Sequence, residues 1–290
     1  MKCSYKLLVV LSVLLVCGSV PSFHIHRNFV ADKKCGVEAS SNLIHRNPWL
    51  VFLEFHDQSD MIDIRCAGTL IDMWHVVTAA HCVKHYTSKL VARFGEYDVS
   101  KSKDCMFSVC ADPVVKIEVE EVIVPGGYKN YEYGSDIAIL KLKYRAPYTD
   151  FIRPVCLPTG PINQNAIFVA TGWGEMISSN LYSDTKKMIP LPFCSLDDCR
   201  RVYSRINLPD DIICAGGVNG MDTCRGDSGG PLLWIRERVE LRGVINTGYS
   251  RCGTEGFPGL YISVENHLEW IEAIRNGYYD GSIRLILSLN

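Results

Sequence analysis

The chain has 290 residues, of which 47% are hydrophobic and 21% charged, the composition of an ordinary globular protein. This excludes the disordered, collagen-like and coiled-coil classes and allows one large domain or two small ones around a sizeable core. Thirty basic residues against 32 acidic residues give a formal net charge of −2. Such a balance lacks the basic surface expected of a protein that binds nucleic acid or an anionic membrane.

Residues 1–20 have the features of a secretory signal peptide. Lys2 and Lys6 flank the apolar run 7–16, and small residues follow it. The run is too short for a membrane span, which takes about 20 apolar residues, and no other segment is long enough. We therefore expect a signal peptide over 1–20, a short pro-segment over 21–34 and a secreted, extracellular protein.

The cysteine content agrees with secretion. The chain has 13 cysteines, which is too many for a typical reduced cytosolic protein. Cys3 and Cys17 lie in the signal peptide, which leaves eleven in the mature chain. We expect disulfides among them, but the spacing alone does not select one pairing from the many that are conceivable.

The rest of the chain has the pattern of many short strands. We predict strands over 49–55, 67–71, 91–94, 115–124, 137–143, 166–172, 230–236, 239–245 and 259–263. Gly, Pro, Asn and Asp separate these runs, which favours an all-β protein over alternating strands and helices. Helical patterns are confined to 196–203 and 264–274. We expect two β subdomains that meet somewhere in 144–161.

Three short motifs carry residues suited to nucleophilic catalysis. Residues 78–82 read TAAHC, residues 136–140 read DIAIL and residues 226–231 read GDSGGP. A serine hydroxyl needs an imidazole to take its proton, and that imidazole needs a carboxylate to fix its tautomer. Taken singly, each motif also has an ordinary structural explanation. The histidine could belong to the core or surface, the aspartate to a turn, and the glycine-rich serine segment to a tight turn.

Together, in the order His, Asp, Ser, the motifs resemble those of the trypsin-like (chymotrypsin-fold) serine proteases. Subtilisins and α/β-hydrolases arrange the same three residue types in other orders. The resemblance extends over 35–274 and includes the segments 47–49 (NPW), 66–70 (CAGTL), 171–174 (TGWG) and 258–261 (PGLY). It implies two packed six-stranded β-barrels with a C-terminal helix over 35–276. A tail over 277–290 follows, whose apolar stretch 283–289 either packs locally or meets a partner.

The resemblance implies a catalytic role for four residues. Ser228 would be the nucleophile, His81 the general acid and base, and Asp136 the carboxylate that orients it. The backbone N–H groups of Gly226 and Ser228 would form the oxyanion hole, because the glycines around the serine let the backbone approach a substrate carbonyl.

A substrate pocket is implied in the same way. Asp222, six residues before Ser228, would lie at the base of the S1 pocket and pair with an Arg or Lys side chain. Taken alone, Asp222 could equally be a solvated turn residue. Gly248 and Gly259 match the pocket-wall glycines that leave room for a long side chain. Asn246 and Thr247 replace the usual Ser and Trp, so we expect altered specificity beyond the first substrate residue or weaker activity. Whether Asn246 replaces the hydrogen bond of that Ser to the buried aspartate is left open by the sequence.

The resemblance also implies which cysteines pair. The implied disulfides are Cys35–Cys156, Cys66–Cys82, Cys199–Cys214 and Cys224–Cys252. Cys105 and Cys110 resemble an extra disulfide of arthropod clip-type protease domains, although no clip module precedes the domain here. Phe168 and Trp234 stand where many relatives have another disulfide. Cys194 is left over, either as a free thiol or as a link to a partner chain.

Activation is where the chain departs from its relatives. The relatives are zymogens, and activation cuts them just before an Ile-Val-Gly-Gly-like sequence. The cut frees a new N-terminal ammonium group, which pairs with the aspartate preceding the nucleophile. In this chain that aspartate is Asp227. No such start lies between Cys35 and Trp49, where Arg46 is the only Lys or Arg. A truncated sequence, an unusual zymogen and a protease homologue without activity all remain open explanations.

Two hypotheses for the function follow. The first is a secreted serine endopeptidase, expected to be a monomer, that cleaves proteins or peptides after Arg or Lys and is a target for serpin-type inhibitors. The second is a non-catalytic homologue that binds or regulates in an extracellular proteolytic cascade. Neither requires a cofactor. We expect no metal, because Glu96 and Asp98 offer too few oxygens for the six or more that calcium takes.

Overall fold

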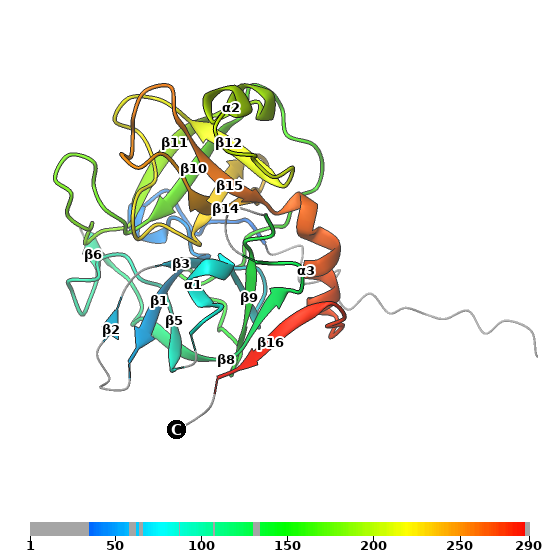
Figure 1. Cartoon of the computed structure of the whole chain (residues 1–290). Coiled ribbons are helices and arrows are strands. Elements are labelled where there is room, and N and C mark those ends of the chain that lie inside the picture. Colours follow the sequence, from blue (N-terminus) through cyan, green and yellow to red (C-terminus); the bar gives the residue numbers. More distant parts are fainter. Residues whose placement is uncertain are drawn as a thin grey trace, which may run out of the picture. The chain divides into compact units, whose positions relative to one another are not determined.

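Antiparallel strands form most of the structure, which is a computed structural model (Figure 1). It describes residues 35–57, 62–63, 66–86, 88–106, 108–129 and 134–287. All of them belong to one compact unit, 34–290. The predicted signal peptide and pro-segment lie outside the described residues. Among the described residues, the helices are too short or too polar to cross a membrane.

Six strands close the first barrel in the order β8-β5-β1-β3-β4-β9, and β9 pairs back onto β8. They are β1 (Leu50–His56), β3 (Ala67–Leu70), β4 (His75–Thr78), β5 (Leu90–Phe94), β8 (Val115–Pro125) and β9 (Ala138–Leu142). The short β2 (Ile62–Asp63) pairs with the end of β1. Branched and aromatic side chains such as Leu53, Phe94 and Ile139 are buried inside.

The second barrel closes in the order β10-β11-β12-β15-β14-β13. Its strands are β10 (Ile167–Gly172), β11 (Lys187–Cys194), β12 (Ile212–Gly216), β13 (Pro231–Ile235), β14 (Val239–Thr247) and β15 (Pro258–Ser263). Phe168, Leu232 and Tyr261 are fully buried in its core. The predicted architecture of two six-stranded barrels is therefore confirmed.

Few helices accompany the barrels. They are α1 (Ala80–Val83), α2 (Leu196–Val202), α3 (Leu268–Arg275) and the 3-10 turns η3 (Leu43–His45) and η5 (Glu265–His267). The predictions of helix near 196–203 and 264–274 are confirmed. The side chain of Ser195 caps α2 by accepting a hydrogen bond from the N–H of Asp198.

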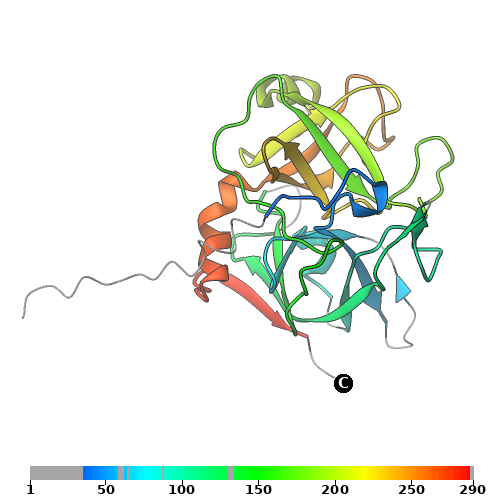
Figure 2. The same ribbon diagram turned by 180° about the vertical axis from the view of Figure 1, so that it is seen from behind.

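The C-terminal tail packs locally. In Figures 1 and 2, α3 leads from the second barrel to the first, where β16 (Ser282–Ile286) lies beside β8. The two strands are antiparallel, with Ile283 opposite Val124 and Ile286 opposite Glu121. Of the two explanations left open for the apolar tail, the structure has the local one.

Five disulfides join the pairs that the resemblance implies. They are Cys35–Cys156, Cys66–Cys82, Cys105–Cys110, Cys199–Cys214 and Cys224–Cys252. The pair Cys105 and Cys110 closes a small hairpin of β6 (Cys105–Met106) and β7 (Val109–Cys110). Phe168 and Trp234 are direct cross-strand neighbours. Cys194 is the free cysteine of the described chain, and burial raises the pKa of its thiol.

Candidate active site

His81 lies where the end of β4 turns into α1. Its backbone N–H donates to Oδ1 of Asp136 at 2.7 Å, and its ring Nδ1 donates to Oδ2 at 2.6 Å. Because a carboxylate only accepts, Nδ1 carries the proton and Nε2 is left as the basic nitrogen. The disulfide from Cys82 to Cys66 fixes the same turn to β3.

Asp136 is fully buried and precedes β9. Its loop is tied to the second barrel, because the N–H of Ser135 donates to Asp211 at 2.7 Å. Gly134 and Ser135 both have the left-handed backbone, with φ of 83° and 54°. From β14, Nδ2 of Asn246 donates to Oδ2 of Asp136 at 3.0 Å. Asn246 thus supplies a hydrogen bond that a serine makes in relatives, a point that the sequence left open.

Ser228 lies in the loop before β13, and this loop is fastened to both barrels. Its carbonyl accepts from the N–H of Ala67 in β3 at 2.8 Å, and the N–H of Gly229 donates to Ile245 in β14 at 2.8 Å. A Cβ at Gly229 would lie 2.2 Å from Oγ1 of Thr78, so the serine loop abuts the end of β4, three residues before His81. The predicted nucleophile and base therefore come from neighbouring backbone segments.

The peptide between Arg225 and Gly226 has a fixed orientation. The carbonyl of Arg225 accepts from the N–H of Glu175 at 2.8 Å. Because the peptide is trans, the N–H of Gly226 points the opposite way, away from Glu175. Gly226 has φ of 90°, and a Cβ there would lie 2.7 Å from the Tyr182 ring. Only glycine fits this position without a shift of its surroundings.

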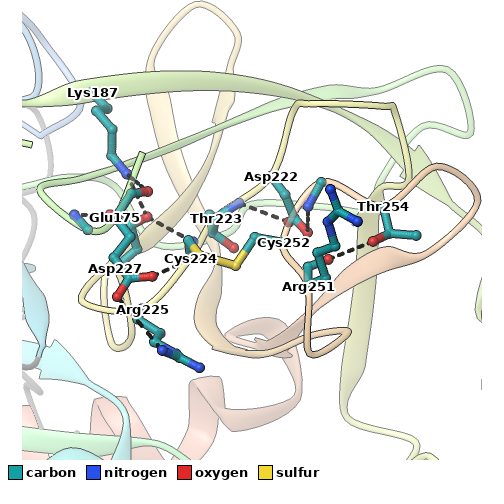
Figure 3. The surroundings of a disulfide bond; sticks show 12 residues. Glu175, Lys187, Asp222, Thr223, Cys224, Arg225, Asp227, Arg251, Cys252 and Thr254 are labelled. Atoms are coloured by element: carbon teal, nitrogen blue, oxygen red, sulfur yellow. Dashed lines mark hydrogen bonds and ion pairs between the residues drawn. A yellow bond between two sulfur atoms is a disulfide. The ribbon is translucent and has the colours of Figure 1, made fainter. Parts of the chain in front are cut away.

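Asp227 is fully buried and has three hydrogen-bond donors. The N–H of Gly174 donates to Oδ1 at 2.7 Å, and the N–H of Cys224 donates to Oδ2 at 3.0 Å. The third donor is the ammonium group of Lys187, whose Nζ lies 3.0 Å from Oδ2 (Figure 3). The sequence analysis did not single out Lys187, because nothing near it in the chain distinguishes it from an ordinary strand lysine.

A pocket of about 270 Å³ opens beside Ser228 and has Asp222 at its wall. The carboxylate of Asp222 accepts from the N–H groups of Thr223 at 2.8 Å and Gly253 at 3.1 Å (Figure 3). The side chain is buried, and this burial raises the pKa of the Asp222 carboxyl. The two hydrogen bonds oppose the shift, and the charge of Asp227 adds to it.

The two predicted glycines border the same pocket. Gly248 is one of its lining residues, and a Cβ at Gly248 would lie 3.7 Å from Cα of Gly259. A Cβ at Gly259 would lie 3.1 Å from Oδ1 of Asp222 and 2.8 Å from the hydroxyl of Tyr261. A side chain at Gly259 would therefore crowd the Asp222 carboxylate in the pocket.

Two groups of potential metal ligands are engaged with the protein itself. Cys66, His81 and Cys82 are close together among the described residues, but the two cysteines form a disulfide. In the loop after β5, Glu96 pairs with Arg93 and Asp98 pairs with Lys101. Asp104 is a third carboxylate there, which the sequence analysis did not count; it accepts from the N–H groups of Tyr97 and Asp98.

Comparisons with known proteins agree with this fold. The family model described as Trypsin matches residues 36–271. The chain is 34% identical to the CLIP domain-containing serine protease HP8 of Bombyx mori, over 83% of the chain and 71% of that protein. It is 37% identical to Melanization protease 1 of Drosophila melanogaster, over 78% and 62%. It is 32% identical to Phenoloxidase-activating factor 3 of Holotrichia diomphalia, over 89% and 79%.

The chain therefore belongs to the trypsin family of serine proteases. The resemblance to arthropod clip-type proteases is also confirmed, since relatives with such names match most of the chain. The chain spans less than two thirds of the length of Melanization protease 1.

Proposed function

We propose that this chain is a secreted serine endopeptidase that hydrolyses peptide bonds after Arg or Lys through an acyl-enzyme. One observation carries the proposal. The ring of His81 is held by a buried Asp136 next to the Ser228 loop, and a pocket with an acidic wall opens beside that serine. These are the parts that nucleophilic attack on a peptide bond after a basic residue requires.

The chemistry follows from the tautomer of His81. Nε2 takes the proton of the Ser228 hydroxyl while Oγ attacks the carbonyl carbon of the substrate. The N–H groups of Gly226 and Ser228 stabilise the oxyanion that forms. The imidazolium, stabilised by Asp136, then gives its proton to the leaving amine, which leaves an ester on Ser228. Water attacks this ester in the reverse sequence and frees the enzyme.

Asp222 supplies the preference for a basic side chain. Its carboxylate keeps acceptor capacity beyond the two backbone hydrogen bonds, and Asp222 is only 5% exposed. An Arg or Lys side chain that enters the pocket neutralises this buried charge. An apolar side chain of similar length would leave it unpaired, which is costly.

The proposed substrates are proteins of an extracellular proteolytic cascade. The names Melanization protease 1 and Phenoloxidase-activating factor 3 support this class of substrate. Serpin-type inhibitors are proposed as partners, since they offer such enzymes a cleavable loop. We propose a signal peptide over 1–20, a pro-segment over 21–34, a protease domain over 35–276 and a monomeric state.

Hydrolysis of a panel of tripeptide amides tests the specificity. We expect kcat/KM for Arg and Lys at the cleaved position to exceed that for Leu or Phe at least ~100-fold. The Asp222→Ser variant should lose most of that preference, because the buried carboxylate is its source. Ser228→Ala should abolish turnover. Equal rates across the panel would contradict the proposed pocket role.

The non-catalytic homologue remains the second candidate, and the missing activation start between Cys35 and Trp49 favours it. Labelling of the purified protein by a serine-reactive fluorophosphonate separates the two candidates. A label that depends on Ser228, before or after limited trypsin treatment, supports the endopeptidase. Absence of such a label in both samples supports the homologue.

A further inference from the structure

Asp227 requires a cation. A buried carboxylate without a positively charged partner is costly, so the loop that carries Asp227, Gly226 and Ser228 should not keep its shape without one. In relatives the cation is the ammonium group freed by activation cleavage. The sequence between Cys35 and Trp49 has no start of that kind.

We propose that Lys187 takes the place of this ammonium group, so that the oxyanion hole forms in the uncleaved chain. Its role is that of a positioning residue, acting on the nucleophile loop through Asp227. The inference rests on the proposed function and adds how the site is switched on. It means that the chain needs no activating protease.

The contacts of Lys187 support this role. Nζ lies 3.0 Å from Oδ2 of Asp227 and 3.1 Å from the carbonyl oxygen of Glu175. The Lys187 side chain is 17% exposed and that of Asp227 is 1% exposed, so little water competes for the ion pair. Figure 3 shows the lysine reaching from its strand to both acceptors.

A continuous set of hydrogen bonds leads from Lys187 to the oxyanion hole. The ammonium group holds the carbonyl of Glu175, and the N–H of Glu175 holds the carbonyl of Arg225. That carbonyl sets the peptide plane whose other side carries the N–H of Gly226. Lys187 thus acts on the oxyanion N–H by two routes, one through Asp227 and one through Glu175.

Close packing around Asp227 makes the arrangement specific. A Cβ at Gly172 would lie 2.3 Å from Oδ1 of Asp227, and one at Gly174 would lie 2.5 Å from Cγ. The carboxylate is therefore enclosed by backbone on the side of residues 172–174. Two backbone N–H groups also bind the carboxylate of Asp227. The ammonium group of Lys187 is its third donor.

The segment that would have to supply a new N-terminus is tied down elsewhere. The side chain of Glu38 accepts from the guanidinium of Arg46 at 2.8 Å and from the N–H of Asn47 at 2.9 Å. A cut after Arg46 would free only Asn47 and Pro48 ahead of the fully buried Trp49. Two residues span about 7 Å at most, so this end could search only a small volume.

Labelling of the intact, uncut secreted protein by a fluorophosphonate tests the inference, because the reagent needs both the nucleophile and the oxyanion hole. We expect wild type to be labelled at Ser228 without cleavage. Lys187→Met removes the charge at nearly constant volume and should slow labelling about 10- to 100-fold. Lys187→Arg keeps the charge and should label at a rate close to wild type.

Lys116→Met is the matched control. Lys116 also pairs with a buried carboxylate, Glu54, at 2.8 Å, but it lies on β8 of the first barrel. The labelling rate of Lys116→Met should stay within about twofold of wild type. Thermal unfolding of each variant shows whether it folds. If Lys187→Met does not fold, Lys187→Ala is labelled with and without added n-butylammonium, which should restore the rate.

The outcomes separate the inference from the function on which it rests. Labelling of wild type only after cleavage, or equal rates for wild type and folded Lys187→Met, would overturn the inference and leave the endopeptidase intact. A failure of butylammonium to restore Lys187→Ala would also count against it. No Ser228-dependent label in either cut or uncut wild type would overturn both.

Discussion

A single amide changes the surroundings of Asp136, the proposed catalytic carboxylate. Asp136 receives the ring and backbone N–H groups of His81 and the side-chain amide of Asn246. The burial of Tyr128 and the charge of Asp136 beside it raise the pKa of that phenol, which therefore stays protonated. Asn246 thus supplies a hydrogen bond to Asp136 in place of the serine of relatives.

Removal of this amide should affect the chemical step. We predict that Asn246→Ala lowers kcat about tenfold with little change in KM, because a hydrogen bond to a charged group contributes about 1.5–3 kcal/mol. Asn246→Ser should recover most of the loss. Asn165→Ala, on an exposed turn, is the control. Steady-state kinetics on an Arg substrate measures all three, and an unchanged kcat for Asn246→Ala would contradict the assigned role.

The sequence named the candidate triad and pocket residues, left the hydrogen bond of Asn246 open and missed Lys187. His81, Asp136, Ser228 and Asp222 stand in recognisable local motifs. Lys187 and Asn246 contact partners 40 and 110 residues away in the chain, so local sequence shows neither contact. Only the closed barrels bring such partners together.

At the scale of elements, α3 fastens the two barrels to each other. It follows the last strand of the second barrel, and its Arg275 donates from Nε to Asp72 of the first barrel at 2.9 Å. The turn at Asp72 also receives N–H groups of Trp74 and His75. Burial alone would raise the pKa of Asp72, but hydrogen bonds and charges from His75 and Arg275 outweigh it, and the pKa is lowered.

Loss of this ion pair should weaken the fold in a pH-dependent way. We predict that Arg275→Gln lowers the free energy of unfolding by about 3 kcal/mol near neutral pH, because it leaves Asp72 buried with fewer partners. The folded pKa of Asp72 lies below its unfolded value of about 3.9, so the contribution is present above that pH and is lost as pH falls through the folded pKa.

Urea unfolding of wild type and Arg275→Gln between neutral and acid pH measures the effect, with the exposed Arg205→Gln as the control. The difference between wild type and Arg275→Gln should shrink toward the acid end. A difference that stays constant across the whole range would show that Asp72 is not the partner that matters.

Strands were predictable where Gly, Pro, Asn and Asp separate short apolar runs, and not where the chain departs from that pattern. The nine predicted runs all correspond to strands, with ends shifted by one or two residues. In β11, Pro190 and Pro192 suppress the strand signal, yet both prolines are accommodated in a strand that pairs with β10. The strands β4 and β12 were also not predicted, and β16 needs its partner β8 to be recognised as a strand.

At the scale of the molecule, the start of the domain joins both barrels. The N–H of Gly36 donates to Pro154, and its carbonyl accepts from Val239 at the start of β14. Cys35 is bonded to Cys156, 121 residues further on, so one disulfide closes a loop that contains the whole first barrel. The strand pattern indicated a β protein with two subdomains that meet within 144–161, and the family resemblance identified them as six-stranded barrels.

This long-range disulfide should contribute strongly to stability. We predict that Cys35→Ser/Cys156→Ser lowers the free energy of unfolding by about 4–5 kcal/mol, as chain entropy gives for a loop of this length. Thermal and urea unfolding measure it, while labelling of Ser228 shows whether the site persists. Cys194→Ser should change stability by less than about 1 kcal/mol. Equal stabilities of the double variant and wild type would refute the entropic contribution.

The C-terminal strand β16 has a consequence for solubility. It occupies the side of β8 over residues 121–125 that β5 leaves unpaired. Without it, a row of main-chain amides and carbonyls would be open to a strand of another molecule. The tail therefore covers this sheet edge and opposes self-association. A protein shortened at the end of α3 would keep its proposed catalytic residues and yet aggregate through this exposed sheet edge.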